Sequence, residues 1–202
     1  LNLSPDHLSR HGGMDGYVQA KRRIFRNQTP HDWAIVGVDD TRSQVMATQL
    51  TAEGLRRVIT VSAEYGLGRG VSVLDGQLCD SMMGRAGPPH DISKARALPG
   101  QHNHQNAAAA YAACRALGLE PSDIVAAILT FPGLPHRLET IGSIDGVRFI
   151  NDSKATNADA AEKALAAYQP IYWIVGGTPK AEGIEPLAPL FELRVPTGGD
   201  SW

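Results

Sequence analysis

The sequence has little cysteine, no excess of charge of either sign and no long apolar run, and each absence excludes a class of protein. Its 2 cysteines, Cys79 and Cys114, lie far apart without metal-ligand spacing, which argues against a disulfide framework. The 19 Lys and Arg against 21 Asp and Glu give a net charge of −2, so neither nucleic acid nor an anionic membrane surface is an expected partner. No apolar run approaches the roughly 20 residues of a membrane span. We therefore expect a cytoplasmic protein.

The 202 residues suffice for one large or two small domains with a hydrophobic core. The chain starts at Leu1, without Met, and enters directly into L-N-L-S-P-D-H, a pattern typical of a strand end and its loop. Its last residues, P-T-G-G-D-S-W, follow an apolar helix-like segment at residues 184–191. These ends predict that the chain is a fragment of a longer protein.

Hydrophobic periodicity predicts an α/β fold in which strands and helices follow one another. Expected helices are residues 14–26, 41–50, 105–117, 121–131 and 158–168, and expected strands are residues 32–38, 57–62, 71–78 as a hairpin, 143–150 as a strand pair, and 171–175. The segment F-P-G-L-P-H at residues 131–136 is typical of a linker. We expect two domains, residues 1–132 and residues 133–202.

The most informative segment is V-R-F-I-N-D-S-K-A-T-N at residues 147–157, where a strand pattern stops at polar residues before a helix. Thr156 with Asp159 forms a capping-box pattern, and such a turn at a sheet edge is where α/β proteins bind anionic ligands. The strand expected at residues 171–175 would bring Lys180 to the same edge as Lys154. A capped surface turn with solvated side chains is an equally good interpretation of the segment alone.

A lysine lies on the apolar face of the first predicted helix. At 100° per residue Lys21 falls within the arc formed by Met14, Tyr17, Val18, Ile24 and Phe25. Its ammonium group either extends past these neighbours to water or lies in a pocket of low dielectric constant, where a neutral amine becomes a nucleophile. Reaction of that amine with carbon dioxide gives a carbamate, an anionic oxygen ligand for a hard divalent metal.

Histidines supply further candidate ligands. His102 and His104 form an H-x-H pattern in G-Q-H-N-H-Q-N, which is compatible with a zinc hydrolase, although no third ligand is evident nearby. Contacts of Asn103 and Asn106 with a nucleotide, or helix capping, explain the segment better. His7, in S-P-D-H, is either a metal or phosphate contact or a polar loop residue.

Five motifs in series resemble the Mur ligases over nearly the whole chain. They are N-L-S-P-D-H-L-S-R-H, Y-V-Q-A-K, L-P-G-Q-H-N-H-Q-N-A, G-L-P-H-R-L-E and N-D-S-K-A-T-N. The last two resemble the members that add D-glutamate to UDP-N-acetylmuramoyl-L-alanine. The resemblance implies part of a P-loop-type, mostly parallel central domain that binds ATP, followed by part of a Rossmann-like C-terminal domain that binds the amino acid.

The resemblance also implies a reaction in which ATP phosphorylates the substrate carboxylate and the amine of D-glutamate attacks the acyl phosphate. The protein would act as a monomer with ATP and magnesium, and its two domains would close over the substrates. Lys21, as a carbamate, and His7 would lie at a second magnesium and the acyl phosphate. The implied nucleotide contacts are Asn103, Asn106, His136, Arg137 and Asp152, and the implied D-glutamate contacts are Lys154, Thr156 and Lys180.

The sequence departs from the family pattern because it contains no P-loop of the G-x-x-x-x-G-K-[ST] type to bind the ATP phosphates. We therefore expect the longer parent protein to be the ligase and this chain alone to be inactive. Two alternatives stay open, a nucleotide-binding fragment without catalysis and a sibling Mur ligase that uses another amino acid.

Overall fold

The computed structural model describes residues 1–5, 8–178 and 183–194, and its chain divides into two compact units. The first contains Leu1–Arg96 and Gln101–Thr130, and the second contains Ala97–Gly100 and Phe131–Trp202. The division after Thr130 lies directly before the segment predicted to be the linker, residues 131–136. The roles of the two domains, residues 1–132 and 133–202, stay predictions. Each unit is described by itself.

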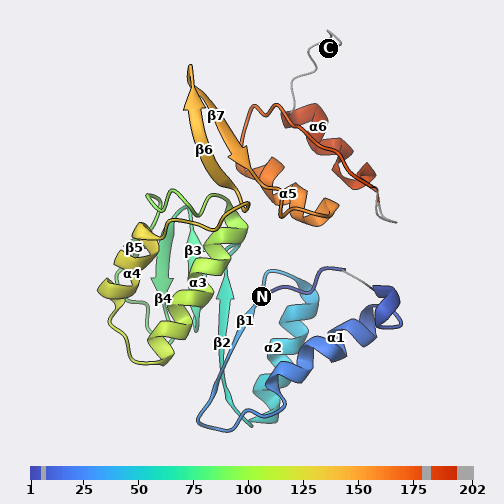
Figure 1. Ribbon diagram of the computed structural model, residues 1–202. Helices are drawn as coiled ribbons and strands as arrows, with labels where there is room; N and C mark the ends of the chain where they lie inside the picture. The colour runs from blue at the N-terminus through green and yellow to red at the C-terminus, as the bar shows by residue number, and fades with distance from the viewer. Residues whose placement is uncertain (6–7, 179–182, 195–202) are drawn as a thin grey trace. The chain divides into compact units, whose positions relative to one another are not determined.

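The first unit is built on a five-stranded sheet in the order β1-β2-β3-β4-β5 (Figure 1). Strands β1, β2 and β3 pair in parallel, and β4 and β5 extend the sheet by antiparallel pairing. The strands are β1 (Trp33–Gly37), β2 (Arg57–Ser62), β3 (Val71–Leu74), β4 (Gln77–Asp80) and β5 (His90–Asp91). The expected α/β class is confirmed, with a mixed sheet.

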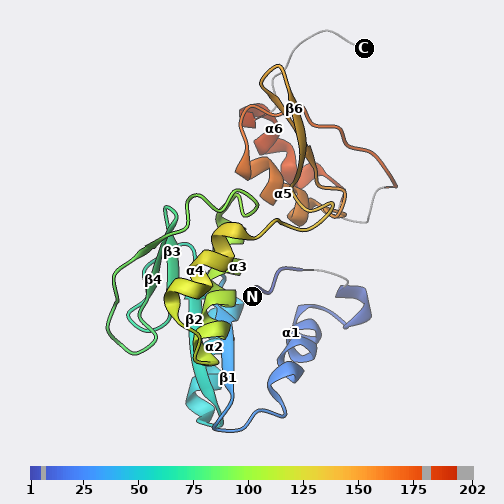
Figure 2. The same cartoon turned by 60° about the vertical axis from the view of Figure 1, so that its left-hand side comes forward.

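Helices cover both faces of β1. The helices of this unit are η1 (Leu8–Arg10), α1 (Met14–Arg22), η2 (Arg23–Phe25), α2 (Thr41–Glu53), α3 (Gln101–Ala116) and α4 (Pro121–Thr130). The β1 residues Ala34 and Val36 are buried in one cluster with Leu50 of α2. Successive side chains of a strand point to opposite faces, so Gly37 belongs to the other face. There a Cβ on Gly37 would lie 2.9 Å from Nε2 of Gln105, so α3 covers that face (Figure 2).

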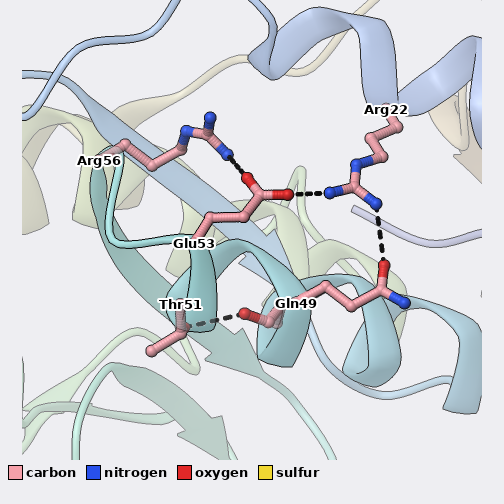
Figure 3. A network of polar contacts seen from close by, with 6 residues as sticks. Arg22, Gln49, Thr51, Glu53 and Arg56 are labelled. Atoms are coloured by element: carbon pink, nitrogen blue, oxygen red, sulfur yellow. Dashed lines mark hydrogen bonds and ion pairs between the residues drawn. The ribbon is translucent and has the colours of Figure 1, made fainter.

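Helix α1 is fixed to α2 by a polar network in which one carboxylate pairs with two arginines (Figure 3). Arg22 pairs with Glu53 through one nitrogen and donates to Gln49 through the other, at 3.0 Å. Arg56 donates to the second oxygen of Glu53 at 2.7 Å. Because Arg22 directly follows Lys21, this network also fixes the part of α1 that bears Lys21.

The first predicted helix is shorter than expected. Residues 14–26 form α1 only as far as Arg22, and η2 follows as a 3-10 turn. A 3-10 turn has 3.0 residues per turn instead of 3.6, so a wheel drawn at 100° per residue does not place Ile24 correctly. Met14, Tyr17, Val18 and Phe25 pack against the core as expected, but Ile24 is exposed. None of the helices described has the length and the apolar surface that crossing a bilayer requires.

The second unit consists of a β-hairpin and short helices (Figure 1). Its elements are β6 (Glu139–Ile144), β7 (Val147–Asn151), α5 (Ala158–Ala167), η3 (Glu185–Leu187) and α6 (Ala188–Arg194). Leu138 of the segment before β6, Leu165 of α5 and Leu187 of η3 are buried. The rings of Trp173 and Phe191 lie 5.3 Å apart between centroids.

The prediction of a strand at residues 171–175 is wrong, because these residues have no regular secondary structure. A strand exists through hydrogen bonds to a neighbouring strand, and no strand in the described part of the chain pairs with this segment. Ile174 of this segment is 99% exposed. The expectation that two strand ends bring Lys154 and Lys180 to one sheet edge therefore fails, and Lys180 itself lies outside the described residues.

Helix α5 begins at Ala158 as predicted, but the capping residue is Asn157 rather than Thr156. The backbone of Asn157 is extended, and its Oδ1 accepts a hydrogen bond from the backbone N–H of Ala160 at 2.8 Å. A side-chain acceptor placed there satisfies one of the free N–H groups of the first turn. Thr156 therefore does not cap the helix, and its side chain is exposed.

We predict that Asn157→Ala lowers the free energy of unfolding by about 1 kcal/mol, because the N–H of Ala160 loses its acceptor. Asn157→Asp should retain most of the stability, since a carboxylate accepts the same hydrogen bond and interacts favourably with the helix dipole. Urea unfolding of the three proteins measures the effect. Equal stability of the alanine variant and the wild type would contradict the assignment of the cap.

Candidate functional site

Several of the predicted site residues meet where the turn after β7 contacts the segment before β6. The backbone N–H of Lys154 donates to the carbonyl of His136 at 3.0 Å, and the backbone N–H of Leu138 donates to Oδ1 of Asp152 at 3.0 Å. Asn151 lies 2.7 Å from Nδ1 of His136. The motif G-L-P-H-R-L-E and the motif N-D-S-K-A-T-N are therefore joined by hydrogen bonds, although they are distant in sequence. Lys154 and Thr156 are exposed beside this junction.

The backbone at this junction is unusual. His136 and Leu138 have φ angles of 64° and 46°, in the left-handed region that non-glycine residues rarely adopt. Such a conformation costs about 1–3 kcal/mol for each residue and persists only where surrounding contacts fix it. The N–H of His136 donates to Glu139 at 2.8 Å, and Leu138 is buried. Strained backbone of this kind is found preferentially at functional sites, which supports the predicted role of the segment.

The carboxyl group of Asp152 is half-buried, and burial raises its pKa above the usual value of 3.8. The hydrogen bond from Leu138 and the positive charge of Arg137 act in the opposite direction but do not outweigh the desolvation. The fold therefore disfavours the charged form of Asp152. A charge that is kept at a cost to stability is typical of a residue selected for binding or catalysis.

We predict that Asp152→Asn stabilises the fold at pH 7, because an amide oxygen still accepts the hydrogen bond from the N–H of Leu138 and no charge is desolvated. The folded pKa is raised, so the wild type loses stability as the pH rises above the unfolded value of 3.8. The gain of the variant should thus shrink as the pH falls toward that value. Urea unfolding of the wild type and the variant, at pH 7 and at a pH near 3.8, measures how far the stability gain shrinks. Asp145→Asn, at the exposed hairpin turn, is the matched control, and an equal response of both variants would contradict the prediction.

Asn103 and Asn106 lie in the first turns of α3, in the first unit. Asn103 is buried and Asn106 is exposed, and Nδ2 of Asn106 lies 3.3 Å from Oδ1 of Asn103. Burial lowers the pKa of His104, and the charge of Asp75 opposes this shift. His102 and His104 are two positions apart on one helix, so their side chains point in different directions. Within the described residues no group of three or more His, Cys, Asp or Glu side chains could bind a metal ion.

Lys21 is exposed, with Nζ 5.1 Å from the centroid of the Tyr17 ring. Of the two alternatives for this lysine, the structure has the one in which the side chain extends past its apolar neighbours to water, and not the pocket of low dielectric constant. An ammonium group cannot coordinate magnesium, so the predicted metal role depends on carbamate formation at the accessible amine. The second predicted metal contact, His7, lies outside the described residues.

A polar cluster that the sequence did not predict lies at the carboxyl ends of β1 and β2. The carboxylate of Asp39 accepts hydrogen bonds from the hydroxyl of Ser62, from the N–H of Ala63 at 2.9 Å and from Nε2 of Gln105 at 2.7 Å. The neighbouring Asp40 caps α2 by accepting from the N–H of Ser43 at 2.8 Å. The signal in the sequence was the pair of acidic residues directly after a buried strand, which predicts a position at the sheet edge but not its partners.

With this geometry established, comparison with known proteins gives the family. A family model described as the Mur ligase middle domain matches residues 1–114. The chain belongs to the Mur ligase family. This Mur ligase chain is also similar in fold to a crystal structure of MurF from Acinetobacter baumannii. The TM-score is 0.60 at 26% identity, and the match covers 81% of this chain and 35% of that chain.

Individual relatives of this Mur ligase chain have more specific names. It is 56% identical over 191 residues to the UDP-N-acetylmuramoylalanine--D-glutamate ligase of Caulobacter vibrioides, covering 95% of this chain and 41% of that protein. It is 54% identical over 191 residues to the ligase of the same name from Rhodospirillum rubrum, covering 95% of this chain and 40% of that protein. The chain thus spans about two fifths of the length of these relatives.

Proposed function

We propose that this chain is part of an ATP-dependent ligase that joins D-glutamate to UDP-N-acetylmuramoyl-L-alanine in the cytoplasm, acting as a monomer. The observation that supports this most strongly is the 56% identity to a D-glutamate ligase across 95% of the chain. The same alignment covers the turn at residues 151–157, which exposes Lys154 and Thr156 as donors for a carboxylate. The sibling ligases use other amino acids, so the choice of D-glutamate depends on this turn.

The proposed reaction has two steps. A carboxylate oxygen of UDP-N-acetylmuramoyl-L-alanine attacks the γ-phosphorus of ATP, and ADP leaves, which gives an acyl phosphate. The amine of D-glutamate then attacks the acyl carbon, the C–O bond to phosphate breaks, and the amine loses a proton as the amide forms. Both steps place negative charge on phosphoryl oxygens, so the site must supply cations rather than an acid and base pair.

The residues of the second unit would bind the amino acid and part of the nucleotide. The exposed Lys154 and Thr156 can donate to a carboxylate of D-glutamate, and Lys180 is proposed as a further partner. Asp152, His136 and Arg137 are the proposed nucleotide contacts. The hydrogen bonds between residues 136–138 and residues 152–154 would hold both groups in one fixed arrangement.

The residues of the first unit would bind adenine and the metal. Asn103 and Asn106 have amide groups that suit the hydrogen-bonding edge of adenine. Magnesium, when bound, would neutralise charge on the transferred phosphoryl group. The proposed contacts to it are Lys21, once converted to a carbamate, and His7.

Release of ADP tests the proposal. The product of the complete reading frame that contains these residues should release ADP only when ATP, UDP-N-acetylmuramoyl-L-alanine and D-glutamate are all present. The 202-residue chain alone should release none, because its sequence contains no P-loop. A complete product that is inactive with D-glutamate but active with another amino acid would refute the substrate. Binding of ATP without turnover of any substrate would favour the alternative of a nucleotide-binding protein without catalysis.

A further inference from the structure

Helix α3 is held at two points by the polar cluster around Asp39, and both points lie in its first turns. Gln105 donates to Oδ2 of Asp39 at 2.7 Å, and Gln101 donates to the carbonyl of Ala63 at 3.0 Å. Ala63 is itself bound to Asp39 through its N–H. The carboxylate of Asp39 thus connects the ends of β1 and β2 with the start of α3.

The strands that form the base of this cluster are themselves fixed. Gly37 of β1 is paired with Val61 of β2, and the N–H of Val38 donates to the carbonyl of Val61 at 2.9 Å. The hydroxyl of Ser62 donates to Asp39 and accepts from the N–H groups of Glu64 and Tyr65, both at 3.1 Å. Contacts with both strands therefore fix the position of Asp39 independently of α3.

There is little free space between the Gln105 side chain and the sheet. A Cβ on Gly37 would lie 2.9 Å from Nε2 of Gln105, closer than real Cβ atoms approach other groups. The Gln105 side chain is buried. A shift of α3 along the sheet would therefore strain the hydrogen bond of 2.7 Å from Gln105 to Asp39.

The asparagines proposed to contact adenine lie on a different side of α3 from these two glutamines. At about 100° per residue, Gln101 and Gln105 share one face, and Asn103 and Asn106 lie roughly 120° to 180° around the helix. Asp39 is therefore not placed to touch a nucleotide bound by the asparagines. It can act on that nucleotide only by fixing the position and rotation of α3.

We propose that Asp39 is a positioning residue for the adenine end of the nucleotide site, acting through Gln105. This inference rests on the proposed function, in which Asn103 and Asn106 face adenine. A helix that is free to rotate by a few degrees moves those amide groups away from hydrogen-bonding geometry, and small displacements of binding groups reduce binding strongly. Loss of the Asp39 to Gln105 hydrogen bond should thus weaken ATP binding rather than slow the chemical steps.

Two variants separate this role from general stability. Gln105→Ala removes the bond to α3 but leaves Asp39 bound to β2, whereas Ser62→Ala removes a bond to β2 but leaves the bond to α3. In the product of the complete reading frame, Gln105→Ala should raise the KM for ATP roughly tenfold. The kcat and the KM for D-glutamate should change less than about twofold, and Ser62→Ala should leave the KM for ATP within about twofold of the wild type.

Calorimetric titration with ATP and thermal melting complete the test. If Gln105→Ala and Ser62→Ala lower the melting temperature alike and change no KM selectively, Asp39 is merely structural and the inference is overturned. If Asp39→Ala, which removes the acceptor of the Gln105 hydrogen bond, leaves the dissociation constant for ATP unchanged in a folded protein, it is overturned as well. A wild type that binds ATP but turns over no substrate refutes the proposed function and leaves the calorimetric comparison valid.

Discussion

Lys21→Ala is expected to lower kcat by about 10²- to 10³-fold in the product of the complete reading frame, the range observed when an enzyme loses a group that stabilises developing charge. The exposed amine of Lys21 can react with carbon dioxide, and the resulting carbamate would supply anionic oxygen to magnesium. A short carboxylic acid added to the alanine variant should restore part of the activity, because its carboxylate can occupy the space that the side chain leaves. Turnover with and without the acid measures both effects.

Lys21→Arg separates the carbamate from the positive charge. A guanidinium retains the charge near the Tyr17 ring but forms no carbamate, so this variant should be as inactive as Lys21→Ala. Gln19→Ala, at an exposed position of the same helix, is the control and should be active. A carbamate resonance in the carbon NMR spectrum of the wild type, produced by labelled bicarbonate and missing in both lysine variants, would support the assignment independently. Full activity of Lys21→Arg would exclude the carbamate.

Tyr111→Ala is expected to lower the free energy of unfolding by about 3–5 kcal/mol, as the loss of a large buried side chain does. Tyr111 of α3 is 0% exposed, and its hydroxyl donates to Oδ2 of Asp80 at 3.1 Å. Tyr111→Phe retains the ring and should cost only about 1 kcal/mol, because Asp80 keeps its contacts with Arg115 and Met82. Urea unfolding of the three proteins at pH 7 measures the ring and the hydroxyl separately, and a smaller loss for alanine than for phenylalanine would contradict the packing.

The same hydroxyl predicts a dependence on alkaline pH. Burial, followed by the charge of Asp80, raises the pKa of Tyr111 from 10.0 to about 12. Because the unfolded chain releases this proton first, the stability is intact below pH 10 and falls as the pH rises from 10 to about 12, by at most about 3 kcal/mol. Tyr111→Phe lacks this proton, so its stability should fall less over the same range. Parallel pH profiles of the two proteins would show that Tyr111 does not titrate as described.

The elements that the sequence predicts well are those determined by residues close together in the chain. Asp75 and Gly76 have φ angles of 49° and 75°, and Asp145 and Gly146 have 49° and 82°, so both Asp-Gly pairs form the hairpin turns expected of them. Strand β2 has the bounds predicted from its apolar residues, Arg57–Ser62. In each case the local pattern and the final structure require the same conformation.

The start of α3 could not be predicted in the same way. The polar run Q-H-N-H-Q-N at residues 101–106 looks like a loop and its cap, and the helix was expected from residue 105, yet α3 begins at Gln101. The hydrogen bonds that Gln101 and Gln105 make join residues 38 and 66 positions apart, and no local pattern contains such partners. For the same reason the sequence does not reveal the role of Asp39, whose partner Gln105 lies 66 positions away.

For the candidate site, the structure brings some of the proposed residues together, and the roles of the site residues come from the family resemblance. The junction of residues 136–138 with residues 152–154 follows from two motifs that hydrogen bonds bring together. Of the two alternatives for Lys21, the structure has the exposed side chain, and the helical wheel placed Ile24 wrongly because the backbone has already changed to a 3-10 turn there. The roles of Lys21, Asn103, Asn106, Lys154 and Thr156 in binding stay predictions until the variants are measured.

The unpaired segment at residues 171–175 has a practical consequence for every experiment on the isolated chain. Tyr172 and Ile174 are among its exposed apolar residues, and an apolar segment with free backbone groups can pair with the same segment of another molecule. Two copies joined in this way would form a non-native sheet and withdraw protein from solution as its concentration rises. Inactivity of the 202-residue chain should therefore be judged only on material that elutes as a monomer in size-exclusion chromatography, with Ile174→Lys as a variant designed to resist this association.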